Sequence, residues 1–396
     1  LSLTLNTAKR EINESLKFCL FAARCLGISF DAPKSKLTRI MKNILFFLSV
    51  FFVIIHASSD AVYISLIPFN IENTVPLLHT QGYTILSAIK ASVLWYKKDV
   101  FQQLLTELAE IWPVSPLKVE NQTVKDKSLK TLRTIHAWYF AANFFGVWFY
   151  NLTPICQHYF RKFNGEESQV GTIWSSWYPF DETQPVSHFF VYIFEMVMGQ
   201  VCVWVTLSTD LLLSGISSHI VLLLRCLQGQ LKSLTVSNKT EEEYHRDIVD
   251  CIKLHQRLIR YCKDIGKVFS FVNLANIVVS SVNICCVVFT IMVKEPILVP
   301  SNKIFLMAAL LQAGMLCSNG QGNSNIAIAA YNSEWYEMTP RCRRALFFII
   351  QRTQKPIGFT AMGFTYISMM TYTAILTRAY SYFALLYTLY NKNKEQ

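Results

Sequence analysis

Long runs of apolar residues recur through this chain of 396 residues, and they constrain its fold more than any other feature. Each run approaches the roughly 20 residues that a helix needs to cross a bilayer. Only helices and closed barrels can cross, because lipid offers backbone N–H and C=O groups no hydrogen-bond partner. The runs are continuous, whereas the strands of a barrel would alternate apolar and polar residues. The sequence therefore predicts an all-α membrane protein.

Composition and motifs exclude several other classes of protein. Hydrophobic residues make up 52% of the chain and charged residues 16%, which is less charge than a soluble domain carries. The net charge of +11 is not accompanied by zinc spacing, an RNP motif or a basic helix repeat, so no nucleic-acid partner is expected. The motifs HExxH, CxxC, GxSxG and Walker A are absent. We expect no enzymatic activity, cofactor or metal site.

Seven candidate spans follow from the apolar runs. The last run is longer than one crossing and is interrupted by Pro356 and Gly358, which predicts a first helix over 342–355 and a second over 359–389. An internal inverted repeat, typical of transporters, is not detected. The predicted spans cover approximately residues 37–57, 74–96, 131–153, 186–216, 266–293, 303–331 and 344–388.

The distribution of Lys and Arg predicts the orientation. Counted loop by loop, 26 basic residues fall on one side of the seven spans and six on the other. Basic residues collect on the cytoplasmic side of membrane proteins. The N-terminus is therefore expected in the cytoplasm and the C-terminus outside, which is the reverse of a G-protein-coupled receptor. Of eleven cysteines only Cys156 falls in a predicted outer loop, so no extracellular disulfide is expected within the chain.

The stretch 217–264 is predicted to extend spans four and five into the cytoplasm as helices. Leu254, Leu258 and Tyr261 form one apolar stripe with charges opposite. Such stripes need either each other, in a cap folded within one chain, or another subunit. The chain divides into residues 1–216 with spans one to four, residues 217–264 as the cytoplasmic extensions of spans four and five, and residues 265–396 with spans five to seven.

Four ionisable residues lie inside predicted spans, where a charge is costly and usually faces a cavity or a partner. Lys90 is expected to snorkel to the cytoplasmic surface. Asp210 is expected to make a packing or gating contact. Glu195 either lines a pocket or hydrogen-bonds to a neighbouring span. The fourth, Arg378, shares one helical face with Ser381, Leu385 and Leu389, and this face is predicted to meet a water-filled pore. The alternative for Arg378 is that it bends away from the pore and pairs with a carboxylate or a carbonyl.

The outer halves of spans two to four are rich in large side chains. Aromatic rings with one or two polar groups suit a small apolar ligand. Ordinary helix packing or an interfacial aromatic belt is the alternative explanation. The candidate ligand-binding residues are His79, Tyr83, Phe144, Phe145, Trp148, Tyr192, Glu195 and Met196.

The C-terminal third resembles the insect odorant receptor family. The resemblance rests on Cys317 and Gly320, on Tyr331 and Trp335 four residues apart, and on a basic helix followed by proline. The element Tyr-Ser-Tyr-Phe at 380–383 completes it. The spacing matches over about 70 residues, and elsewhere the similarity is limited to span count, orientation and the pair Thr209–Asp210. Gustatory receptors are the alternative family, but their usual ending departs from residues 381–387.

The resemblance implies a fold and a function. It implies an odorant-gated, non-selective cation channel built as a tetramer, with a ligand pocket in each subunit and a pore lined by the last span. Leu385 and Leu389 match the family's hydrophobic gate. It implies a tuning subunit that assembles with a shared co-receptor in the plasma membrane of sensory neurons, because the segment between spans four and five is short. A small volatile hydrophobic ligand is expected.

Overall fold

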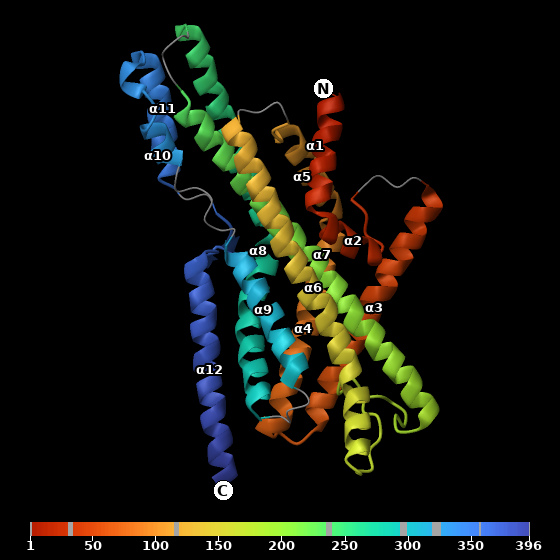
Figure 1. The fold of residues 1–396 in the computed structure, drawn as a ribbon. Helices are drawn as coiled ribbons and strands as arrows, with labels where there is room; N and C mark the ends of the chain where they lie inside the picture. Colours follow the sequence, from red (N-terminus) through yellow and green to blue (C-terminus); the bar gives the residue numbers. More distant parts are fainter. Residues whose placement is uncertain are drawn as a thin grey trace.

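The computed structural model describes residues 2–30, 35–114, 119–234, 240–293, 299–318, 326–355 and 358–395 of the chain. These residues form a helical bundle (Figure 1). We call the end that carries the N-terminus the upper end, and the end that carries the C-terminus the lower end (Figure 1). The family-motif position Gly320 and the predicted helix breaker Pro356 lie outside the described residues.

Seven long helices follow the order of the seven predicted spans, and most of them are longer than predicted. Because α7 and α8 are continuous, each runs from the lower half of the bundle into the upper end without a break (Figure 1). Their bounds are α3 (Lys36–Leu66), α4 (Ile71–Tyr96), α6 (Val119–Phe163), α7 (Pro185–Lys232), α8 (Glu241–Val293), α9 (Val299–Ser318) and α12 (Met369–Glu395).

Three short helices at the upper end were not expected from the sequence: α1 (Ser2–Ser15), α2 (Lys17–Cys25) and α5 (Lys98–Ile111). They are amphipathic and each buries an apolar stripe, as Cys19 of α2 and Leu108 of α5 illustrate with 0% exposure. Leu16, between α1 and α2, is also 0% exposed. Leu16 fits beside Gly215 of α7, where an added Cβ would lie 2.1 Å from the leucine side chain. The search for membrane-length runs could not find such helices, because their apolar stripes are short.

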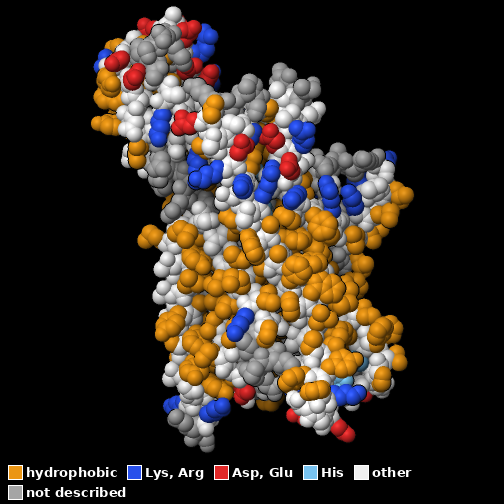
Figure 2. All heavy atoms as spheres, viewed as in Figure 1, with side chains coloured by type: hydrophobic (Ala, Val, Ile, Leu, Met, Phe, Trp, Pro, Cys, Tyr) orange, Lys and Arg blue, Asp and Glu red, His pale blue; other side chains and the backbone are white. Residues whose placement is uncertain are grey.

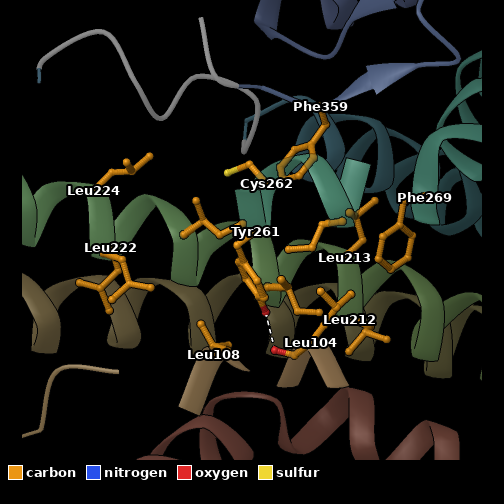
Figure 3. Packing of buried hydrophobic residues seen from close by; sticks show 14 of the residues in the cluster. Leu104, Leu108, Leu212, Leu213, Leu222, Leu224, Tyr261, Cys262, Phe269 and Phe359 are labelled. Carbon is orange, nitrogen blue, oxygen red and sulfur yellow. Dashed lines mark hydrogen bonds between the residues drawn. The ribbon is translucent and has the colours of Figure 1, made fainter. Parts of the chain in front are cut away.

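The hydrophobic core continues into the upper end, where α5, α7 and α8 contribute to it (Figure 3). Leu258 and Tyr261 of α8 are 0% exposed, and the Tyr261 hydroxyl donates a hydrogen bond of 2.8 Å to the Leu104 carbonyl oxygen (Figure 3). The apolar stripe of α8 is therefore covered within one chain. By contrast, Phe347 and Phe348 of α11 (Pro340–Thr353) are 61% and 64% exposed.

A broad hydrophobic surface lies below a band of charged side chains (Figure 2). On α3 the outward face carries Leu37, Ile44, Phe47 and Phe51, each more than half exposed. A contiguous apolar face of this size is tenable in lipid but not in water. Within the described residues, α3, α7 and α8 are long and apolar enough to cross a membrane by length and composition, whereas the other predicted spans do not meet that criterion.

The segment after α9 corrects one prediction. It contains α10 (Ile326–Tyr331), a 3₁₀ turn (Trp335–Glu337) and α11, and then an antiparallel hairpin of β1 (Thr360–Ala361) and β2 (Thr365–Tyr366). The predicted start of a helix at residue 359 is wrong, since α12 begins at Met369. The hairpin turns through Met362 and Gly363, both at positive φ, a conformation that ends any helix.

Candidate functional site

A small cavity lies in the lower half of the bundle, between α4, α6, α7 and α9. The space open to the centre of a water-sized sphere is about 30 Å³, which is room for one or two water molecules. Small residues create it: an added Cβ at Gly199 would lie 2.9 Å from the Trp174 ring and 3.3 Å from the Val147 side chain. The residues that line it are Tyr83, Ala142, Asn143, Gly146, Val147, Tyr150, Trp174, Gly199, Val203, Phe305 and Ala308.

The loop between α6 and α7 closes this cavity by placing Trp174 against it. The Trp174 ring stacks on Tyr150, with centroids 4.7 Å apart and an interplanar angle of 20°. Its Nε1 donates to the backbone carbonyl oxygen of Glu195 at 3.1 Å. The loop is also attached to α3, because the Ser176 hydroxyl donates to the Asp60 carboxylate. Trp174 is therefore held from two sides.

Glu195 of α7 fixes the loop rather than facing the cavity. Its side chain is fully buried, and its carboxylate accepts from the backbone N–H of Ile173 at 2.6 Å and of Trp174 at 3.2 Å. The Tyr178 hydroxyl also donates to it, at 2.8 Å. Of the two alternatives that the sequence left open, the structure supports neither in full: the carboxylate binds a loop, not a ligand cavity or a neighbouring span.

The structure does not bring the eight candidate ligand-binding residues into one site. Tyr83 lines the cavity, and His79 contacts its wall through Phe305, with ring centroids 5.3 Å apart. Phe145 and Trp148 are 57% and 39% exposed on the outer surface of α6 and do not line the cavity.

The remaining candidates make structural contacts. Phe144 stacks on Phe140 at a centroid distance of 5.9 Å. The Tyr192 hydroxyl donates to the backbone carbonyl of Asn151. Met196 is half-buried and does not line the cavity. Three aromatic cavity residues that the sequence analysis missed are Tyr150, Trp174 and Phe305. Trp174 and Phe305 lie outside the three spans searched, in the loop before α7 and in α9. Tyr150 lies within the third predicted span.

A buried polar cluster lies next to the cavity, towards the upper end. Asp210 Oδ2 accepts three hydrogen bonds: from Lys90 Nζ at 2.9 Å, from the Tyr139 hydroxyl at 2.9 Å and from Gln312 Nε2 at 2.7 Å. These donors come from α4, α6 and α9, so one carboxylate of α7 joins four helices. The expectation that Lys90 snorkels to the surface is wrong, because its side chain is 0% exposed and paired with Asp210.

The cavity and this Asp210 cluster share a helix turn. Asn143 lines the cavity, and its Nδ2 donates to the Tyr139 carbonyl oxygen at 2.9 Å. Tyr139 in turn donates to Asp210. Asn143 of the cavity lining is therefore one hydrogen bond away from a member of the Asp210 cluster.

Helix α12 packs on the bundle through a narrow face. Thr371, Ile375 and Ala379 are buried, and Tyr390 packs on Phe289 of α8 with ring centroids 5.7 Å apart. The rest of its surface is exposed in one chain. The four predicted pore residues are exposed beside the packing face rather than opposite to it, with Leu385 and Leu389 being 60% and 41% exposed. These residues, predicted to share one face, are Arg378, Ser381, Leu385 and Leu389.

The described residues offer no grouping of three or more His, Cys, Asp or Glu side chains that could hold a metal ion. Fold and cavity together define a class of protein: a helical membrane protein whose long helices surround a small, mostly apolar cavity closed by a loop. Residues 71–380 match the family model described as 7tm Odorant receptor. The chain belongs to this family.

Two odorant receptors align with nearly the whole chain. Odorant receptor 85c of Drosophila melanogaster is 26% identical over 95% of this chain and 99% of its own length. Odorant receptor 85b of the same organism is 24% identical over the same shares. These relatives are odorant receptors rather than enzymes.

The fold is similar to that of a solved insect receptor. The structure of the olfactory receptor OR5 from Machilis hrabei in complex with eugenol has a TM-score of 0.82, with 16% identity, over 97% of this chain and 99% of that one. The structure of the same receptor described without eugenol gives a TM-score of 0.80. The seven-span architecture expected from the apolar runs is that of the family.

Proposed function

We propose that this protein is a subunit of an odorant-gated, non-selective cation channel. A small volatile hydrophobic compound binds in the cavity beside Tyr83, and the pore is formed by α12 of four subunits. The observation that carries the proposal is the pairing of an enclosed, mostly apolar cavity with a helix whose polar face is left open. The cavity of about 30 Å³ must widen to admit such a ligand, since ligand pockets are usually 300–1,000 Å³.

The proposed orientation places the N-terminus and the upper end in the cytoplasm and the C-terminus outside. It rests on the excess of Lys and Arg at the upper end. The upper helices then form the anchor between subunits, with α11 as the cytoplasmic helix of the split last span. The exposed Phe347 and Phe348 of α11 suit contact with a neighbouring subunit. The protein resides in the plasma membrane of sensory neurons.

The proposed partner is the shared odorant co-receptor, with this chain as the tuning subunit of a heterotetramer. The short connection between α7 and α8 supports this role, since a longer segment is expected of the co-receptor. A gustatory-type channel is the alternative. A sugar would need several polar groups, and the cavity lining offers mainly aromatic and aliphatic side chains, which favours an odorant.

The test is voltage-clamp recording with a panel of volatile odorants, with and without the co-receptor. We expect ligand-evoked cation current only when both subunits are expressed. A current opened by sugars rather than by volatile compounds would favour the gustatory alternative. Absence of ligand-evoked current with surface expression intact would contradict the channel proposal.

A further inference from the structure

A groove of about 690 Å³ lies between α2 and α6, outside the cavity and the Asp210 cluster. Its long wall is a stripe of α6 residues spaced three or four apart, so they lie on one face of that helix. Phe18 of α2 forms part of the opposite wall and packs on Phe140 at a ring-centroid distance of 5.1 Å. The lining residues are Lys17, Phe18, Asp126, Leu129, Lys130, Arg133, Thr134, Ala137, Trp138 and Ala141.

The chemistry of the groove changes along its length. Towards the upper end α6 contributes Lys130 and Arg133, together with the carboxylate of Asp126. Lys17 of α2 adds a third cation, and its Nζ lies 5.0 Å from the centroid of the Phe18 ring. With Glu14, which pairs with Arg133, the groove has three cations against two carboxylates. The Asp126 carboxylate is bound by Gln122, whose Nε2 lies 3.1 Å and 3.2 Å from its two oxygens. Towards the lower end the lining becomes apolar.

The distance between the charged part of the groove and its aromatic part matches an amphipathic ligand whose long axis is perpendicular to the bilayer. Trp138 follows Lys130 by eight residues, which is about 12 Å along a helix. Its ring is 69% exposed, and exposed tryptophan is typical of the membrane interface. The band of charged side chains above the hydrophobic surface marks the same boundary (Figure 2).

The charges are open to a ligand. Lys17 and Lys130 are exposed. Arg133 is 39% exposed. Its Nη2 lies 3.3 Å from Oε1 of Glu14 in α1, and the Glu14 side chain is itself 59% exposed. A phosphodiester would place its charge beside Lys130 and Arg133, and its acyl chains would lie against the indole of Trp138.

We propose that this groove binds the headgroup of an anionic phospholipid of the adjoining leaflet. The proposal uses the orientation given above, under which that leaflet is the cytoplasmic one, where anionic lipids are concentrated. Lys130 and Arg133 bind the phosphate, and Trp138 contacts the upper acyl chain. Bound lipid would also tether α2 to α6, since the groove has walls from both helices.

The experiment measures lipid contact directly and needs no channel opening, so its failure is separate from failure of the proposed function. The full chain is reconstituted in phosphatidylcholine vesicles with increasing amounts of phosphatidylserine that carries brominated acyl chains. Bromine quenches tryptophan fluorescence on contact. The part of the signal lost in Trp138→Phe reports the groove. We expect saturable quenching by brominated phosphatidylserine and weak, non-saturating quenching by brominated phosphatidylcholine.

Charge variants test the headgroup site. Lys130→Gln should weaken apparent lipid affinity about fivefold, and Lys130→Gln with Arg133→Gln about 30-fold, from the usual gain per basic residue near an anionic surface. Lys127→Gln is the matched control, because Lys127 is an exposed residue of the same helix outside the groove. The apparent lipid affinity of this variant should stay unchanged. Lys130→Gln alone suffices if the double variant does not fold.

Three results would overturn the proposal. Equal losses in Lys127→Gln and Lys130→Gln would show diffuse surface charge rather than a site. Unchanged saturation in Lys130→Gln would remove the headgroup contact. Full displacement of the brominated lipid by soluble glycerophosphoserine would assign the groove to a free anion rather than to a lipid.

Discussion

Helices α7 and α12 are both apolar helices with polar residues inside them, yet they satisfy those residues in opposite ways. The two carboxylates of α7, Asp210 and Glu195, are buried and bind other parts of the same chain. On the exposed surface of α12, three hydroxyls bind the backbone of their own helix. Thr377, Ser381 and Thr388 each donate to the carbonyl oxygen four residues earlier.

The two ways of satisfying polar side chains suit two different functions. A polar group that binds a neighbouring helix fixes the arrangement of one subunit, because an unpaired group in lipid is costly. A hydroxyl that is satisfied by its own helix leaves the surface free to face water or another subunit. Helix α7 therefore stabilises the subunit, whereas α12 is suited to the proposed pore. Four predictions, ordered by the size of the expected effect, test this contrast.

The largest effect is expected for Asp210→Asn. The change leaves the ammonium group of Lys90 buried without its counter-charge, and breaking a buried pair costs about 3–5 kcal/mol. Folded proteins are stable by only about 5–15 kcal/mol, so surface expression should fall sharply. Surface labelling and the thermal unfolding of purified receptor provide the measurement. Asp250→Asn is the control, since the Asp250 side chain is 66% exposed and 3.8 Å from Lys253. Wild-type stability of Asp210→Asn would contradict a stabilising role for the cluster.

The Asp210 cluster shows what periodicity can and cannot predict. The sequence identifies Asp210 and Lys90 as costly residues inside spans, because this depends on local composition alone. Their pairing joins residues 120 positions apart, and no local pattern encodes that contact. Lys90 lies only six residues before the end of α4, so its side chain could have reached the surface if neighbouring helices had not covered it.

The second effect concerns the cavity beside α7. Tyr83→Ala should reduce ligand sensitivity by about tenfold, the lower end of the range for a lost apolar contact. Concentration–response curves under voltage clamp measure it. Trp148→Ala is the matched control, because its exposed ring does not line the cavity and sensitivity should stay unchanged. A tenfold loss in Trp148→Ala with none in Tyr83→Ala would move the site to the outer surface of α6.

The pocket candidates were less predictable than the fold for a physical reason. The apolar runs that predict the seven spans depend only on length and composition. Whether an aromatic residue faces inward depends on how its helix is rotated, and neighbouring positions such as Trp148 and Val147 differ by about 100°. Trp174 is harder still, because its place is set by Glu195 and Tyr150 across a loop.

The third effect tests the open face of α12. Leu385→Ser and Leu389→Ser should each raise current in the absence of ligand severalfold, because a ring of hydroxyls stays wet where a ring of leucines excludes water. Resting current in co-receptor-expressing cells is the measurement. Leu66→Ser is the control, since Leu66 is 63% exposed at the end of α3. Unchanged resting current in both α12 variants would place the gate elsewhere.

The smallest effect is expected for Arg378→Gln, and it compares two cations in the same fold. Lys90 is buried against a carboxylate, whereas Arg378 is exposed on α12 beside Ser381. In the proposed pore Arg378 would repel divalent cations more than monovalent ones, but water and salt screen a single exposed charge strongly. Its removal should therefore raise relative calcium permeability by only about twofold. Reversal potentials in solutions of different calcium content measure this, with Lys392→Gln as a control of equal charge change near the end of α12.

Because the surface of α12 is open in one chain, Arg378 can instead meet a carboxylate of a neighbouring subunit. Unchanged calcium permeability together with reduced assembly would favour that pairing. Arg378, like Lys90, would then have a carboxylate partner, and the two cations would differ only in whether the partner belongs to the same chain or to a neighbouring subunit.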